Sequence, residues 1–173
     1  MTIGRKLAGA FASVLVIIAG MCGGLFWTLD NLRDATAAAV ESRATIQAGE
    51  RSLAALVEAQ NAVRGFVATR NEDFVKKYKE HGDEYEAALA DLNRLASTPA
   101  EQANIAALKT AVQVFSEETQ VQIANARDPI SRDGALASVA LTGRLTNARK
   151  AMNGILDINN KELVVLTAEQ KQA

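Results

Sequence analysis

The sequence contains very few of the residues from which catalytic and metal sites are built. Its 173 residues include one cysteine, Cys22, and one histidine, His81. A lone cysteine has no partner for a disulfide within the chain, and a single histidine supports neither a multi-ligand zinc site nor a Ser-His-Asp triad. We therefore expect a protein that is not an enzyme and that holds no metal or other cofactor.

Aromatic residues and excess charge are also scarce. Aromatic residues make up 5% of the chain, alanine makes up about a fifth, and 19 basic residues nearly balance 20 acidic ones. A nucleic-acid-binding protein needs a net basic surface, so nucleic acid is not an expected partner. A high content of small apolar residues favours closely packed, slender helices.

One long uncharged segment stands at the N-terminus. The run Leu7–Leu29 contains no charged residue, and its length exceeds what a helix needs to cross a hydrocarbon core of roughly 30 Å. Arg5 and Lys6 precede the run and Asp30 follows it, a charge distribution that keeps the short N-terminus in the cytoplasm. The sequence predicts that residues 1–6 lie in the cytoplasm, that residues 7–29 form a helix across the inner membrane, and that residues 30–173 form a periplasmic domain.

A cleaved signal peptide and a lipoprotein signal are the alternatives for this segment. Ala8, Ala10 and Ala12 form the small-residue pattern that cleavage needs, but they come too early to follow an apolar core. A lipoprotein would use Cys22, yet Met21 stands where a small residue is expected.

The periodicity of residues 30–173 predicts an all-α domain, and no segment alternates with period two as a half-buried strand does. Apolar residues three or four positions apart predict four helices: one to about residue 69, one over 72–96, one over 99–127, and one that begins between 129 and 134. The predicted core faces contain Ile46, Leu53, Leu56, Gln60, Val63 and Val67, then Phe74, Tyr78, His81, Tyr85, Ala88, Leu92 and Leu95, then Ile105, Leu108, Val112, Phe115 and Thr119, and finally Leu141, Leu145, Ala148, Met152, Ile155, Asn159, Leu163 and Leu166.

Capping residues mark the turns between these helices. Asn71 can cap the second helix, the segment 98–101 (TPAE) has the pattern of a capping box with proline at the first helical position, and Pro129 prevents the third helix from continuing. No such stop signal follows Leu163, so the chain is expected to continue beyond Ala173.

The number of helices predicts how the domain would signal. Four helices in an up-down-up-down order bring the end of the last helix back toward the membrane, where a second membrane helix would follow. A bundle whose first and last helices both lead into the bilayer can transmit a small displacement across it.

Two blocks of sequence resemble a known sensory family. Residues 60–69 (QNAVRGFVAT), followed by Glu72-Asp73-Phe74 and Tyr78, resemble the arginine-glycine-aromatic signature of the third class of CHASE sensory domains. Gly143-Arg144, Met152 and Glu162-Leu163 are similar to the second block of that family. One position departs from the pattern, because Arg70 stands where glycine is usual.

Residues 1–30 resemble the N-terminus of methyl-accepting chemotaxis proteins, whose sensors share this layout. Together the resemblances imply a homodimeric transmembrane receptor with a second membrane helix, a HAMP linker and a cytoplasmic signalling domain beyond residue 173. They also imply a small molecule or a periplasmic protein as the signal.

Three residues are candidates for contacting a ligand. Arg64 could present its guanidinium to a carboxylate ligand between subunits, or it could form an ion pair with Asp73, Glu80 or Asp83. Arg70 is a second candidate near the same turn. His81 could act as a pH switch, or it could be a packed histidine without a signalling role.

The predicted function is signal sensing by a chemoreceptor on the outer side of the membrane. The input domain of a histidine kinase or a diguanylate cyclase has the same layout and remains an alternative. A membrane-tethered bundle that only binds a partner or has a structural role is the other.

Overall fold

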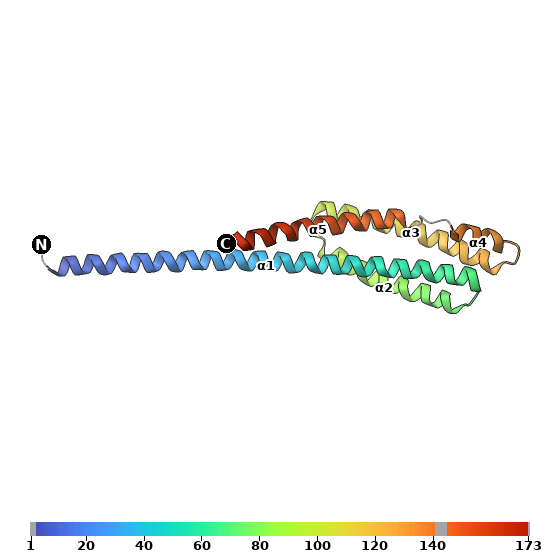
Figure 1. The fold of residues 1–173 in the computed structure, drawn as a ribbon, viewed down its shortest axis with the longest axis horizontal. Coiled ribbons are helices and arrows are strands. Elements are labelled where there is room, and N and C mark those ends of the chain that lie inside the picture. Colours follow the sequence, from blue (N-terminus) through green and yellow to red (C-terminus); the bar gives the residue numbers. More distant parts are fainter. Residues whose placement is uncertain (1–2, 141–144, 173) are drawn as a thin grey trace. The chain divides into compact units, whose positions relative to one another are not determined.

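The computed structural model describes residues 3–140 and 145–172, and within them the side chains of 15–131, 133–137 and 145–168. They form five helices: α1 (Ile3–Thr69), α2 (Asp73–Leu95), α3 (Pro99–Arg127), α4 (Arg132–Ala140) and α5 (Thr146–Gln172) (Figure 1). No strand occurs in these ranges, which confirms the predicted all-α fold. The chain divides into two compact units, one of Met1–Val40 with Val164–Ala173 and one of Glu41–Leu163.

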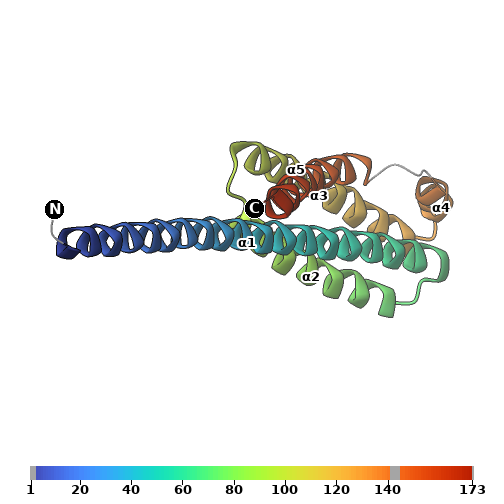
Figure 2. The same cartoon turned by 60° about the vertical axis from the view of Figure 1, so that its left-hand side comes forward.

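The unit Glu41–Leu163 is a helical bundle built from the second part of α1, from α2 and α3, and from most of α5 (Figures 1 and 2). Short turns connect α1 to α2 and α2 to α3, so these helices run in opposite directions, while the segment between α3 and α5 contains α4. Its main core takes buried side chains from all four: Ala48, Ala55 and Leu56 from α1, Tyr85 and Leu92 from α2, Ile105, Leu108 and Phe115 from α3, and Ala148, Ala151, Met152 and Ile155 from α5.

The buried face of α1 is broader than the predicted one and rich in small residues. Leu56, Gln60, Val63 and Val67 are buried as predicted, while Ile46 and Leu53 are half-buried. Beside them lies a second row of buried small residues: Ser42, Thr45, Ala48, Gly49, Ser52, Ala55, Ala59 and Ala62. Small side chains allow neighbouring helices to approach closely. A Cβ atom at Gly49 would meet Leu156 at 3.0 Å and the Met152 sulfur at 3.1 Å.

The start of α3 follows its predicted cap, whereas Glu72, not the predicted Asn71, is the N-cap residue of α2 and makes no side-chain cap. The amide oxygen Oδ1 of Asn71 accepts a hydrogen bond of 2.9 Å from the backbone N–H of Asp73, the first residue of α2. At the start of α3, the Thr98 hydroxyl accepts from the Glu101 N–H and the Glu101 carboxylate accepts from the Thr98 N–H. The capping box is therefore confirmed.

The prediction of one continuous fourth helix was wrong. The structure has two helices in its place, with α4 ending at Ala140 and α5 beginning at Thr146. Leu145, directly before α5, lies in a turn, and residues 141–144 lie outside the described residues. The short α4 packs on α3, and the predicted core residue Leu141 lies outside the described residues.

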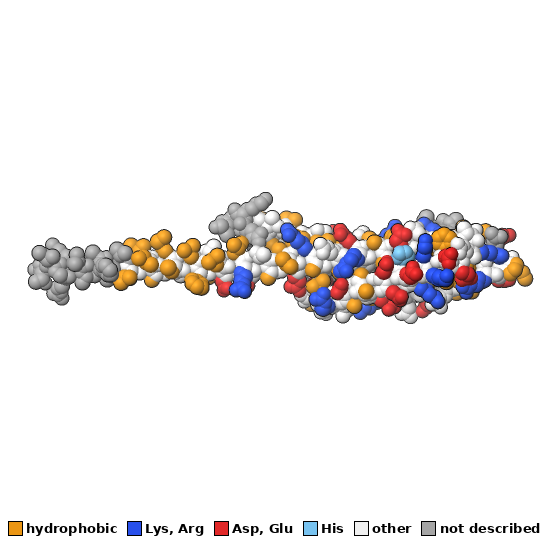
Figure 3. All heavy atoms as spheres, turned by 90° about the horizontal axis from the view of Figure 1, so that it is seen from below, with side chains coloured by type: hydrophobic (Ala, Val, Ile, Leu, Met, Phe, Trp, Pro, Cys, Tyr) orange, Lys and Arg blue, Asp and Glu red, His pale blue; other side chains and the backbone are white. Residues whose placement is uncertain are grey.

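The unit Met1–Val40 with Val164–Ala173 contains the apolar first part of α1. From residue 15 onward its large apolar side chains are exposed, including Ile17, Phe26 and Trp27 (Figure 3). Within the described residues, α1 is the one helix that is long and apolar enough to cross a membrane. Cys22 is exposed on the same segment.

Candidate functional site

The arginine-glycine-aromatic motif lies in the last two turns of α1, next to a second, smaller core. Phe66 is only 1% exposed and packs with Val63, Val67, Ile123 and Ala126. The aromatic residue of the motif is therefore a core residue that joins α1 to α3. This cluster also includes Ala135 of α4.

Gly65 leaves room for an aromatic ring of α2. A Cβ atom at this position would meet three atoms of the Phe74 ring at 2.5–2.9 Å. Phe74 itself is half-buried against the smaller core. The glycine of the motif thus allows the first turn of α2 to pack closely on α1.

Arg64 is the residue of the motif that packing does not explain. It is half-buried, and among the described residues it has no hydrogen bond or ion pair. The expected ion pairs with Asp73, Glu80 and Asp83 do not form there, and Asp73 pairs instead with Lys76 at 3.0 Å. Its proposed contact with a carboxylate ligand stays a prediction.

Arg70 adopts a backbone conformation that favours glycine. Its φ angle is 59°, and its N–H donates a hydrogen bond of 2.7 Å to the Phe66 carbonyl. This geometry is that of the left-handed residue that ends many helices, and it gives a physical reason for the glycine usual at this position. The Nε atom of Arg70 also donates to the Ala126 carbonyl at 3.1 Å, so the side chain links the end of α1 to α3.

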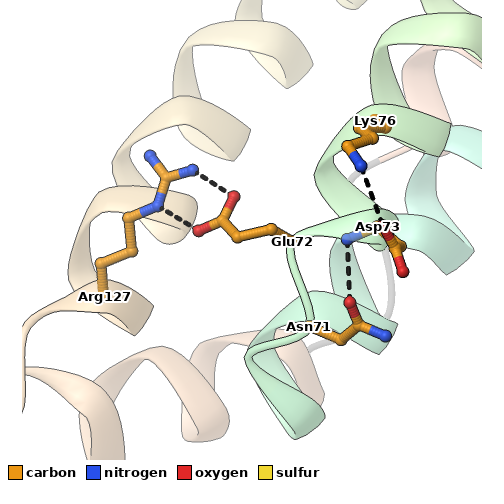
Figure 4. A network of polar contacts seen from close by, with 5 residues as sticks. All are labelled: Asn71, Glu72, Asp73, Lys76 and Arg127. Atoms are coloured by element: carbon orange, nitrogen blue, oxygen red, sulfur yellow. Dashed lines mark hydrogen bonds and ion pairs between the residues drawn. The ribbon is translucent and has the colours of Figure 1, made fainter.

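A two-point ion pair that the sequence did not reveal holds the start of α2 against the end of α3 (Figure 4). Arg127 donates from Nε to Oε1 of Glu72 at 3.0 Å and from a terminal nitrogen to Oε2 at 2.7 Å. The hydrogen bond from Arg127 lowers the pKa of Glu72, and the same bond raises the pKa of Arg127. The guanidinium also lies over the Phe66 ring, 5.5 Å from its centre.

His81 belongs to a different place in the bundle from the two arginines. Its Nδ1 lies 2.8 Å from Oε2 of Glu84, one turn along α2. It lines a surface hollow whose walls come from α1, α2 and α3 and include neither Arg64 nor Arg70. The structure therefore does not join the three predicted residues in one site.

Two polar links connect α5 to its neighbours at the other end of the bundle. The Ser42 hydroxyl of α1 donates to Oε2 of Glu162 at 2.9 Å. The Asn159 amide donates to Oε1 of Glu101 at 2.6 Å. Glu101 is only 2% exposed. Burial raises its pKa, but hydrogen bonds from Thr98, Asn159 and Ser97 outweigh burial, so the pKa of Glu101 is lowered overall.

The second sequence block contributes one side chain to the core and one to the polar link between α1 and α5. Met152 is fully buried, and Glu162 makes the bond to Ser42. Gly143 and Arg144 lie outside the described residues. Sequence periodicity placed Asn159 on the core face of its helix, but its partner Glu101 was assigned only a capping role.

A comparison with protein-family models gives the family of this chain. The family model of the CHASE3 domain matches residues 35–172, which is most of the chain, so the chain belongs to the CHASE3 domain family. CHASE3 is an extracellular sensory domain found in chemoreceptors, histidine kinases and cyclases. Neither the search of curated proteins nor the search of solved structures gave a match.

Proposed function

We propose that this chain is the periplasmic sensory part of a chemoreceptor of the inner membrane, which acts as a homodimer and performs no chemistry. The observation that carries the proposal is the CHASE3 match over residues 35–172, which begins within the same helix, α1, that contains the apolar segment. A sensory domain joined to a membrane helix without an intervening linker suits a signal carried by the helix itself.

The orientation follows from the charges that flank the apolar segment. Arg5 and Lys6 precede it and Asp30 follows it, so the excess of positive charge favours a cytoplasmic N-terminus. The bundle would then lie on the periplasmic side.

The contacts between α1 and α5 support a displacement of these two helices as the signal. Ser42 bonds to Glu162, and Gly49 lies against Met152 and Leu156. In the described part of the two helices, this interface includes small side chains and a polar link, and we expect such a surface to allow small shifts at moderate cost. A ligand that binds one arrangement more tightly would shift the balance by a coupling of about 1–3 kcal/mol.

A cross-linking experiment in a chimeric receptor tests this mechanism. Residues 1–173, with Cys22→Ser, are joined to the second membrane helix and the cytoplasmic part of a well-characterised chemoreceptor. The pair Ser42→Cys and Glu162→Cys is then oxidised, which locks α1 to α5. We expect the oxidised receptor in membranes to hold the activity of its kinase at one fixed level.

The matched control locks α1 to another helix. Arg51 and Asp91 form an ion pair of 3.1 Å between α1 and α2. A receptor with Arg51→Cys and Asp91→Cys, oxidised in the same way, should still change the activity of its kinase. A receptor whose output ignores the α1–α5 lock would contradict the mechanism. Reporter fusions after Leu95 that are active only in the cytoplasm would contradict the topology.

A further inference from the structure

α5 is tied to α3 by a hydrogen bond that is buried at both ends. The bond runs from the Asn159 amide to Oε1 of Glu101 at 2.6 Å, and each residue is 2% exposed. Among the described residues it is the one bond that reaches Oε1, because the bonds from Ser97 and Thr98 end on Oε2. If α5 moved along α3, a buried carboxylate oxygen would lose its partner, which is unfavourable.

Both ends of this bond are held in place by other bonds. Three bonds from the turn before α3 hold the Glu101 carboxylate. The Asn159 amide nitrogen also donates to the Ile155 carbonyl of its own helix at 3.0 Å, which fixes the direction of the side chain. A displacement of α5 along α3 therefore weakens the bond, because neither side chain is free to follow the other.

The bond adds a specificity that apolar packing does not provide. Burial of apolar surface is non-directional, whereas a buried polar residue on an apolar seam can fix the register of paired helices. The residues one turn before and one turn after Asn159 on α5 are Ile155 and Leu163. Neither side chain can donate a hydrogen bond, so a shift by one turn would leave Glu101 facing an apolar group.

The polar link between α1 and α5 is easier to break. Glu162, which accepts the bond from Ser42, is exposed, so water can solvate its carboxylate. The Ser42 hydroxyl can turn to the carbonyl four residues earlier in its own helix. The Thr45 hydroxyl already does this, with a bond of 3.1 Å to the Glu41 carbonyl. Of the two contacts that α5 makes here, the one with α1 therefore yields first.

We propose that the bond between Glu101 and Asn159 fixes α5 on α3, so that these two helices move as one body against α1 when the domain signals. The inference deepens the proposed function, because it names the helix that stays with α5. It rests on that function only for the role of the motion as a signal, since the register of α5 on α3 is a property of the bundle itself.

Spin labels on the whole chain in detergent micelles measure these motions. With Cys22→Ser, the exposed residues Asn61 of α1, Glu117 of α3 and Lys161 of α5 are changed to cysteine two at a time and labelled. The bonds from α1 and α3 to α5 place the α5 label about 27 Å along the bundle from each of the other two. Pulsed electron paramagnetic resonance measures each distance.

A bulky residue at position 49 pushes α1 away from α5. A Cβ atom at Gly49 would already meet Leu156 at 3.0 Å and the Met152 sulfur at 3.1 Å. In Gly49→Leu we expect both distances from the α1 label to shift by about 1–2 Å, while the distance between the α3 and α5 labels stays unchanged. Gly49→Ala repeats the measurement with a smaller side chain.

Two neighbouring asparagines provide the matched variants. Asn159→Leu removes the bond, so in the Gly49→Leu background the distance between the α3 and α5 labels should shift as well. Asn160→Leu changes an exposed residue in the same way and should leave that distance unchanged. Glu101→Gln combined with Asn159→Leu removes the buried charge and keeps an acceptor oxygen for the turn, so it tests the same loss if Asn159→Leu alone fails to fold.

Three outcomes would each overturn the inference: an equal shift of the α1–α5 and α3–α5 distances in Gly49→Leu, an α1 label that does not move, or equal effects of Asn159→Leu and Asn160→Leu. If α3 and α5 stay together in a chimeric receptor whose kinase ignores the α1–α5 cross-link, the result would instead contradict the proposed signalling mechanism and leave the register intact.

Discussion

The amide of Asn159 donates a hydrogen bond of 2.6 Å to the carboxylate of Glu101, and this bond ties α5 to the first turn of α3. The other carboxylate oxygen accepts three bonds, from the backbone of Ser97 and from the backbone and hydroxyl of Thr98. The buried Glu101 carboxylate thus connects the turn before α3 to α3 itself and to α5.

Glu101 should make the domain sensitive to acid. Its folded-state pKa lies below its ordinary value of 4.5, so its contribution to stability is complete above that pH and is lost as the pH falls through the folded-state pKa. Glu101→Gln should lower the free energy of unfolding at pH 7 by about 1–3 kcal/mol. It should also reduce the loss of stability below pH 4.5, as measured by urea unfolding across pH. An unchanged acid profile in Glu101→Gln would show that other carboxylates dominate.

At position 70, glycine should give a more stable protein than alanine, which is the reverse of their usual order within a helix. Because its φ angle is positive, Arg70→Gly relieves backbone strain, while Arg70→Ala keeps the strain, and both lose the bond to Ala126. Arg70→Gly should be more stable than Arg70→Ala by about 1 kcal/mol. Gly82→Ala, in the interior of α2, is the control and should be stabilising. Thermal unfolding that ranks Arg70→Ala above Arg70→Gly would contradict the left-handed turn.

Gly65→Ala should destabilise the protein although alanine is the better helix former. The added methyl group would displace the Phe74 ring, at a cost of about 1 kcal/mol or more. In a Phe74→Ala background the same change should become neutral or favourable. A double-mutant cycle by chemical unfolding measures this coupling, and additive effects would show that the ring does not depend on Gly65.

Thr119→Val should stabilise the bundle by up to about 1 kcal/mol. The Thr119 hydroxyl is fully buried and has no partner among the described residues, so valine removes an unsatisfied group without changing the volume much. Thr110→Val on the exposed side of α3 is the matched control, with little expected effect. A lower melting temperature for Thr119→Val would instead indicate that the hydroxyl binds a buried water or a ligand.

Arg64→Ala should leave the unliganded melting temperature nearly unchanged, within about 0.5 kcal/mol of stability. The reason is that Arg64 has no polar partner among the described residues. Arg127→Ala is the contrasting variant at the same end of the bundle, because it removes both the pair with Glu72 and the contact with Phe66. A clear loss of stability in Arg64→Ala would assign the residue to packing and remove it as a ligand candidate.

Periodicity and capping determined much of this protein by themselves. Apolar spacing defined the helices and most of their buried faces, and the capping box at Thr98 marked the start of α3 at Pro99, because these signals are local in the chain. The turn at Leu145 was missed because the apolar spacing of Leu145, Ala148 and Met152 continues from it into α5.

Only the tertiary structure decided which polar residues meet. Glu72 and Arg127 are 55 positions apart, and Glu101 and Asn159 are 58 apart, so no local pattern links them. The sequence singled out Arg64, Arg70 and His81 by residue type. The packing of helices gave them separate surroundings: Arg64 without a polar partner in the described chain, Arg70 in a turn that favours glycine, and His81 beside a hollow lined by Tyr85. Those differences arise because side-chain environment depends on contacts between helices, which sequence spacing alone does not specify.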